Sequence, residues 1–179
     1  MTASLSFSSI KPSLACKHLV PVKDKDYKDR YFVLDQTDGS ASVADAVDTF
    51  RGGIDPTIGN YYGEKWHPAP PTPKTIVIPY EVSREKELRM IVKSLAVPLK
   101  KLVITEHQLV VLVRDHEESL QLDEFAVFTI VEIDGEYYLF QVRNFVTGSP
   151  RVSVGDYHMQ KPQCEDRYKM CLVLPQVYL

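Results

Sequence analysis

Two apolar segments joined by Asp134-Gly135 constrain the fold of this chain more than any other feature. They read FAVFTIVEI (125–133) and EYYLFQVRN (136–144), and both are rich in the β-branched and aromatic residues that favour strands. Asp-Gly accepts the positive φ angles of a two-residue type I′ turn, so we expect a hairpin in which Ile133 pairs with Glu136. Both faces of this hairpin are apolar away from its tip, which predicts a central pair of strands covered on both sides.

Three acids at the hairpin tip, Glu132, Asp134 and Glu136, stand two residues apart and could suggest a metal site. In the expected register Glu132 and Glu136 project from opposite faces of the sheet, because side chains alternate along a strand. Carboxylates on opposite faces cannot converge on one cation, whose oxygen ligands lie within about 2.0–2.6 Å. Asp134 is explained by the turn itself. We therefore expect a structural hairpin, and the sequence indicates neither a metal nor another cofactor.

The remaining patterns indicate an α+β fold with a mainly antiparallel, strongly curved sheet or partial β-barrel and one or two short helices. Strands are expected at 17–22, 30–35, 75–79, 151–154 and 171–179. The last is expected at a sheet edge, because Pro175 cannot donate to a ladder. KLVIT (101–105) and LVVLVR (109–114) predict a second hairpin, which turns at 106–108.

Two helices are expected. Ser42 can cap a helix over 42–50, in which Val43, Val47 and Phe50 share a face before the stop at Gly52-Gly53. The second helix is expected over 83–95, where apolar residues recur at i, i+3, i+4 and i+7: Leu88, Ile91, Val92 and Leu95.

Length and composition limit the class of protein. With 179 residues and 44% hydrophobic content, the chain can bury a normal core as one domain spanning residues 1–179. Its 3 Cys residues lack the paired spacing of a disulfide framework or a zinc ribbon, which favours a reducing, cytoplasmic location. No apolar run reaches the roughly 18 residues of a transmembrane helix, so we expect a soluble protein with no membrane partner.

Catalytic motifs are few and incomplete. The segment HEESL (116–120) begins like a zinc-protease helix, but Leu120 stands where the second His ligand belongs. Neither a G-x-S-x-G elbow nor a G-x-x-x-x-G-K phosphate loop is present. A non-enzymatic protein is therefore favoured. The alternative is a metal-dependent nuclease or other hydrolase, whose groups converge only in the folded chain from His116, Asp123, Glu124 and Glu132.

The segment 51–74 is the first candidate for recognition. It shows no helical or strand period and contains Tyr61, Tyr62, Trp66 and His67, followed by a proline-rich run. A structureless connection of this length in a compact domain is usually functional or disordered. Exposed aromatics are typical of interfaces, although these rings could equally fold back onto the sheet.

A basic stripe is the second candidate. On the expected 83–95 helix, Lys86, Arg89 and Lys93 face away from the apolar stripe, and Lys100 and Lys101 extend this surface. The stripe could be an ordinary solvated face or a site for phosphates.

The acids gather in one short segment. Residues 115–136 contain 8 acids and no Lys or Arg, and 115–124 forms a third candidate surface.

From these features we expect a binding or interaction module that recognises another macromolecule, with a protein as the favoured partner. The 51–74 aromatic loop and the adjacent charged surface would make the contacts. The alternative is a nucleic-acid-binding protein that uses the basic face of 83–101, which predicts affinity that falls steeply with added salt. The sequence leaves the partner's identity and the oligomeric state open.

Overall fold

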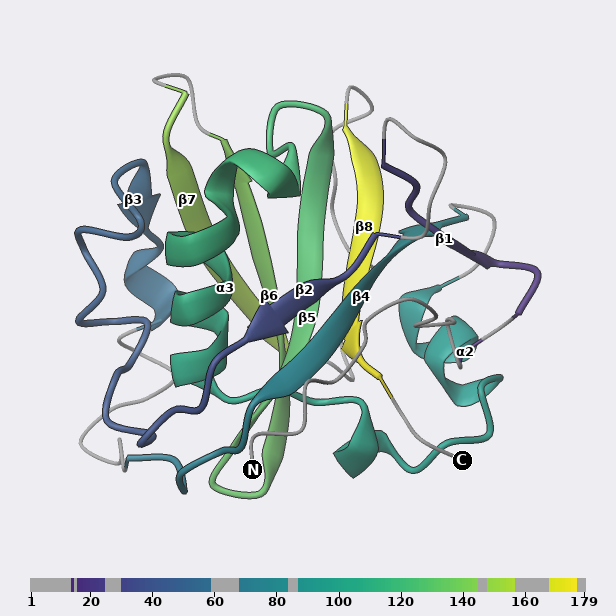
Figure 1. Ribbon diagram of the computed structural model, residues 1–179, viewed down its shortest axis with the longest axis horizontal. Coiled ribbons are helices and arrows are strands. Elements are labelled where there is room, and N and C mark those ends of the chain that lie inside the picture. The colour runs from purple at the N-terminus through teal and green to yellow at the C-terminus, as the bar shows by residue number, and fades with distance from the viewer. Residues whose placement is uncertain are drawn as a thin grey trace, which may run out of the picture.

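The computed structural model describes residues 14, 16–24, 30–58, 68–83, 87–144, 148–156 and 168–176. The strands are β1 (Leu19–Pro21), β2 (Phe32–Leu34), β3 (Gly53–Ile54), β4 (Thr75–Val82), β5 (Phe125–Ile133), β6 (Glu136–Asn144), β7 (Pro150–Asp156) and β8 (Lys169–Pro175). The helices include α2 (Leu88–Lys93), the short 3-10 helix η2 (Leu99–Lys101) and α3 (Glu106–Leu120). The strands form one mixed sheet in the order β1-β4-β8-β5-β6-β7-β3, and β2 also pairs with β4 (Figure 1).

The central hairpin forms in the register that the sequence predicts. Ile133 pairs with Glu136 and Glu132 with Tyr137, so the acids Glu132 and Glu136 belong to opposite faces. Asp134 and Gly135 have φ values of 51° and 82°, as a type I′ turn requires. Residues 125–131 are all buried, which confirms that the strand is covered on both faces.

The sheet differs from the expected antiparallel, strongly curved sheet or partial barrel. It is neither closed nor strongly curled, and β5 pairs in parallel with β8, as β3 does with β7. The prediction failed because β8 does not pair with the strand that precedes it in the chain. It crosses over β6 and β5 and inserts between β5 and β4. Pro175 therefore ends a central strand, where its missing N–H interrupts no ladder, and the prediction of an edge strand was wrong.

The expected second hairpin at 101–114 was also wrong, because residues 106–120 form α3. Its start is a capping box. The Gln108 backbone N–H donates to Thr105 Oγ1 at 3.2 Å, and the Thr105 N–H donates to Gln108 Oε1 at 3.1 Å. Residues 109–113 are buried on all sides of the helix, which removes the periodicity that would have identified it. Burial favours the helix over the strand that the residue types prefer. Burying one apolar side chain stabilises the fold by roughly 1.5–3 kcal/mol, whereas helix propensities differ by at most about 0.7 kcal/mol per residue.

The two expected helices are partly confirmed. Residues 42–50 form turns rather than a helix. Ser42 Oγ still accepts from the Asp45 N–H at 3.1 Å, but Val47 is 62% exposed. In the second segment α2 is shorter than predicted, and residues 84–86 lie outside the described part of the chain. The predicted buried stripe of Leu88, Ile91 and Val92 is confirmed.

Each face of the sheet carries its own core. On one face α3 packs against Val127, Phe140 and Val173. On the other face α2 packs against Ile78, Phe128 and other apolar side chains of the central strands. The helices within the described residues are too short or too polar to cross a membrane.

We expect Thr105→Ala to lower the free energy of unfolding by about 1 kcal/mol, because it leaves the α3 capping box without its hydroxyl acceptor. Urea denaturation followed by far-UV circular dichroism measures this change. Thr105→Ser is the matched control and should stay within roughly 0.5 kcal/mol of the wild type. An alanine variant as stable as the serine variant would show that the cap is dispensable.

Candidate ligand-binding cleft

Pro79 in β4 interrupts the hydrogen bonding between β4 and the strands at the edge of the sheet. β1 pairs with the last residues of β4 and β2 with the first, so the two short strands lie in line along one edge. Between them Val22 N–H donates to Pro79 O at 2.9 Å. An antiparallel partner would normally return a hydrogen bond from its own N–H, but proline has none. The carbonyl of Val22 instead accepts from the Arg30 N–H at 2.9 Å, which fixes Arg30 where the chain rejoins the edge.

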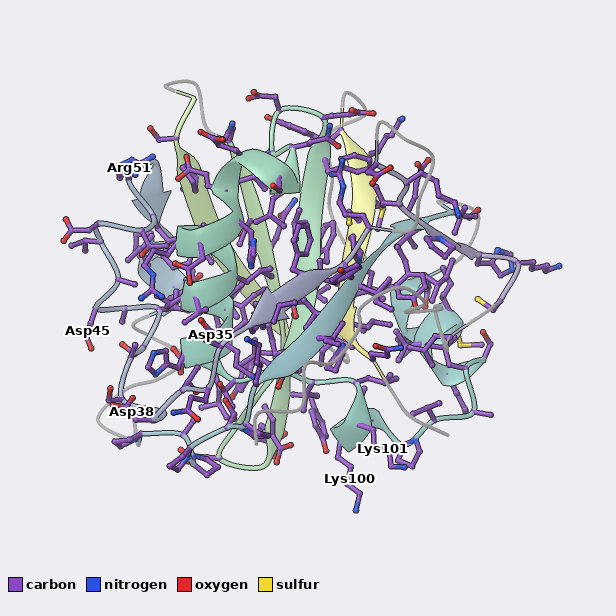
Figure 2. The ribbon with its side chains drawn as sticks, in the orientation of Figure 1. Asp35, Asp38, Asp45, Arg51, Lys100 and Lys101 are labelled. Carbon is purple, nitrogen blue, oxygen red and sulfur yellow. The ribbon has the colours of Figure 1, made fainter. Side chains whose placement is uncertain are left out.

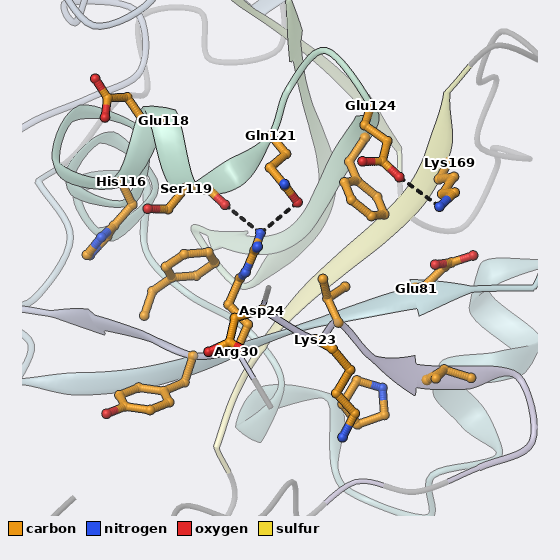
Figure 3. A pocket seen from close by; sticks show the side chains of 16 residues that line it. Lys23, Asp24, Arg30, Glu81, His116, Glu118, Ser119, Gln121, Glu124 and Lys169 are labelled. Atoms are coloured by element: carbon orange, nitrogen blue, oxygen red, sulfur yellow. Dashed lines mark hydrogen bonds and ion pairs between the residues drawn. The ribbon is translucent and has the colours of Figure 1, made fainter. Parts of the chain in front are cut away.

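A cleft of about 820 Å³ lies beside this break (Figure 3). Its walls come from residues 20–24 and 30–32, from the end of α3 and the turn that follows it, and from Glu81 and Lys169 on the sheet. Its apolar lining includes Val22, Phe32 and Phe125, which belong to the core beneath α3. The cleft is thus an apolar end of the core surrounded by charged side chains.

Arg30 is held at the centre of this cleft. Its Nη1 donates to the backbone carbonyl of Ser119 at 2.7 Å and to Gln121 Oε1 at 2.9 Å. Ser119 lies in the last turn of α3, where carbonyls lack helical partners and the helix dipole favours a cation. Gln121 ends the helix with a left-handed backbone (φ 52°), which directs its side chain toward Arg30 (Figure 3). The guanidinium is therefore fixed before any ligand arrives.

A kink in α3 helps to shape the cleft. His116 has φ −130° and ψ 16°, outside the helical region. Its Nε2 lies 3.2 Å from the carbonyl oxygen of Val33, which can only accept, so Nε2 carries the proton. Its ring also packs against Phe32 at a centroid distance of 5.1 Å. His116 thereby attaches the end of α3 to β2.

The charges of the cleft have both signs. Lys169 Nζ bonds Glu124 Oε1 at 2.7 Å and lies 5.6 Å from the ring centroid of Phe125. The hydrogen bond with Glu124 raises the pKa of Lys169, so this pair is neutral overall. Glu81 and Glu118 make no ion pair with any described residue, and the same holds for Arg30. Among the described residues, Arg30, Glu81 and Glu118 thus line the cleft without an ion pair, and the charge of Glu81 also acts on Lys169.

A second hollow, of about 620 Å³, lies at the start of α3 between residues 36–38 and 71–73. Its charged groups are engaged internally. The Asp38 carboxylate accepts from Ser40 Oγ at 2.6 Å and Ser40 N at 2.9 Å, which lowers the pKa of Asp38. It also lies 3.2 Å from His107 Nδ1. These bonds tie the loop after β2 to α3 and leave a less available surface than the cleft at Arg30.

Of the residues predicted for binding, those that the structure describes do not line the cleft. Tyr61, Tyr62, Trp66, His67 and Lys86 lie outside the described residues, so their role stays a prediction. The other predicted cations are exposed on α2 and η2, elsewhere on the molecule from the cleft: Arg89, Lys93, Lys100 and Lys101. Arg89 pairs with Glu87 at 3.3 Å, and Figure 2 shows Lys100 projecting outward at η2.

The groups of the hydrolase alternative are divided by β5. Glu132 stands at one end of this strand and Asp123 and Glu124 precede the other end, roughly 25–30 Å away at about 3.3 Å per residue. Asp123 accepts from Asn144 Nδ2 at 2.7 Å. In the part of the chain that the structure describes, no three His, Cys, Asp or Glu side chains are placed to hold a metal. His116 and Glu124 alone reach the cleft.

The acidic segment 115–124, the third candidate surface, lies at the end of α3 and in the following turn. Arg114 pairs with Asp115 at 2.6 Å and Arg51 with Glu117 at 2.9 Å, so this surface is less negative than its sequence indicates.

Sequence reasoning missed Arg30. The available signals were Pro79 inside a strand pattern and the charged run between 23 and 29, which separates the two short strands. No protein-family model, curated protein or solved structure matches the chain. The residues themselves therefore carry the functional argument.

Cys171, a core residue of β8, provides a test of this region of the structure. Burial raises the pKa of its thiol from 9.0 to about 12, and the nearby charge of Arg30 acts in the opposite direction. Between these two values the unfolded chain binds fewer protons at Cys171 than the folded chain, so we expect stability to fall as pH rises above about 9.

Urea denaturation of the wild type and of Cys171→Val at pH 8 and 10 isolates this effect, because the other ionisable groups are common to both proteins. The valine variant should lose less stability over this interval. Cys16→Ser is the matched control, since Cys16 is only partly buried. Equal losses in the wild type and the valine variant would contradict the burial of this thiol.

Proposed function

We propose that this protein is a non-enzymatic binding module that recognises another protein, and that the cleft at Arg30 forms a principal part of its recognition surface. The observation that carries the proposal is the fixed Arg30 guanidinium. Nη1 is engaged by Ser119 and Gln121, whereas Nε and Nη2 have no partner among the described residues. A cation held in place with unused donors beside apolar side chains is suited to binding.

The mixed charge of the cleft favours a polypeptide. Asp24, Glu81, Glu118 and Glu124 all line it, and they would repel successive phosphates of a nucleic acid. A protein surface carries both signs within a few residues and can match such a pattern.

The described contacts of the cleft also favour binding over covalent catalysis. His116 Nε2 is committed to the Val33 carbonyl, and its ring packs on Phe32. Nucleophilic catalysis needs a hydroxyl or thiol in hydrogen-bond contact with such a base. Within the described residues no side-chain hydroxyl or thiol bonds His116.

The aromatic residues Tyr61, Tyr62 and Trp66 belong to the proposal as a second contact surface. Their support is the sequence, in which bulky aromatics gather in a segment without regular period.

Photocrosslinking tests the proposal directly. A benzoylphenylalanine at Ser119, an exposed lining residue of the cleft, should yield nuclease-resistant protein adducts in lysate of the source cell. Adding Arg30→Gln should reduce the yield at least fivefold. The matched control places the crosslinker at Val47, which is exposed and does not line the cleft.

Equal adducts from both positions, or adducts that disappear with nuclease, would contradict the proposal. Alanine at Tyr61, Tyr62 and Trp66 together, with folding and partner capture unchanged, would remove the aromatic segment from it.

A nucleic-acid-binding function is the second candidate, because residues 88–105 contain four cations and no acid. All four cations are exposed. This function predicts that the logarithm of affinity for single-stranded or duplex DNA falls linearly with the logarithm of salt concentration.

Replacing Lys100 and Lys101 with Gln should reduce the steepness of this salt dependence by about 1.4–1.8, at roughly 0.7–0.9 per phosphate contact. Fluorescence anisotropy at several salt concentrations measures it. Lys74→Gln is the control, since Lys74 pairs with Asp35 outside this segment. An affinity that does not change with salt rejects the candidate.

A further inference from the structure

We infer that the cleft selects a mixed-charge peptide segment, in which one carboxylate binds Arg30 and a cation on either side of it binds Glu81 and Glu118. This inference rests on the proposed function and names the chemistry of its partner. It follows from the order of three charges that form no ion pair with a described residue, and from the apolar side chains that also line the cleft.

Arg30 is prepared for a carboxylate. A guanidinium presents its donors in a planar fork, and Nη1 already spans the Ser119 carbonyl and Gln121 Oε1. These two bonds fix the plane of the group, so that Nε and Nη2 point together along its other edge. That edge matches the two oxygens of one carboxylate. The side chain loses little freedom on binding, because the helix end has already ordered it.

One acid lies on each side of the Arg30 guanidinium. In Figure 3 Glu118 lies toward one end of the cleft and Glu81 toward the other, with Arg30 between them. Glu118 comes from the last turn of α3 and Glu81 from β4. Neither forms an ion pair with a described residue, although the charge of Glu81 also acts on Lys169. Glu118, Arg30 and Glu81 therefore place a negative, a positive and a negative charge in order across the cleft.

The ion pair between Lys169 and Glu124 also borders the cleft. Lys169 is neutralised by Glu124 and packs over Phe125. It therefore offers a ligand little net charge. Phe32 and Phe125 are buried beneath the cleft, and Val20, which is 59% exposed, supplies apolar surface for the carbon chains of the ligand's side chains.

A carboxylate is favoured over a phosphate at Arg30. A phosphate monoester carries nearly two negative charges and would meet the fields of Glu81 and Glu118 on both sides. One carboxylate with neighbouring lysines or arginines places opposite charges against all three groups. A phosphopeptide is therefore the competing ligand that the experiment has to separate.

The probes are fluorescein-labelled nonapeptides with a central Glu and one Lys on each side, at spacings of one, two or three residues. In an extended peptide a spacing of two places all three side chains on one side, about 6.5–7 Å apart. Control peptides replace Glu with Gln, replace Glu with phosphoserine, or keep the composition and move Glu outside the two lysines. Fluorescence anisotropy at low and physiological salt measures the affinities.

We expect at least one Lys-Glu-Lys spacing to bind tenfold or more tightly than its Gln and rearranged controls. Arg30→Gln should abolish the preference for Glu over Gln. Glu81→Gln with Glu118→Gln should abolish the preference for flanking Lys, and it disturbs no described hydrogen bond or ion pair. Glu136→Gln at the exposed hairpin tip is the matched control and should change nothing.

Equal binding of the rearranged peptides, absence of binding at every spacing, or tighter binding of the phosphoserine peptide would overturn the inference. Arg30→Gln also removes a contact to α3, and the double glutamine variant keeps the test decisive if that protein unfolds. Crosslinks at Ser119 that persist without any charge preference among the peptides would overturn the inference alone. Loss of the crosslinks themselves would overturn the proposed function.

Discussion

The sheet of this protein is apolar on both faces, and the need to cover both of them determines most of the structure. β5 lies between β8 and β6, and its residues alternate between the core beneath α3 and the core beneath α2. A strand buried on both faces needs an element on each side. To meet this need residues 106–120 form a helix, although the pattern of residues 109–114 predicts a strand. The same demand places β8 at the centre of the sheet, where its apolar side chains are buried on both faces.

The cleft is a consequence of how this covering ends. α3 terminates over the edge where β1 and β2 meet β4, and Pro79 prevents that edge from being one continuous strand. Arg30 satisfies two carbonyls: its backbone N–H donates to Val22, which Pro79 cannot serve, and its guanidinium donates to Ser119 at the end of α3. One residue thus links the broken edge to the helix end. The same contacts that stabilise this junction orient the cation that we propose as the centre of recognition.

Prediction from sequence succeeded where neighbours in the chain decide the structure. The β5–β6 hairpin and the buried stripe of Leu88, Ile91 and Val92 follow from a two-residue turn and a helical period. Prediction from sequence failed where contacts between segments far apart in the chain determine the structure. The capping signal at Thr105 and Gln108 was present in the sequence, but the run of β-branched residues after it outweighed that signal. Of the cleft, sequence reasoning found His116 and Glu124, as candidates for the hydrolase alternative. Arg30 carries no local motif.

The amino-acid sequence by itself determined the register of the central hairpin, because the Asp134-Gly135 turn permits one pairing and the alternation of side chains follows from it. It likewise determined that Glu132 and Glu136 cannot share a ligand. Only the tertiary structure decided that 106–120 is a helix, that β8 is central, and that Arg30, Glu81 and Glu118 line one cleft. These outcomes depend on which surfaces are left to be buried once the sheet has formed. That is a property of segments far apart in the chain, and no local pattern contains it.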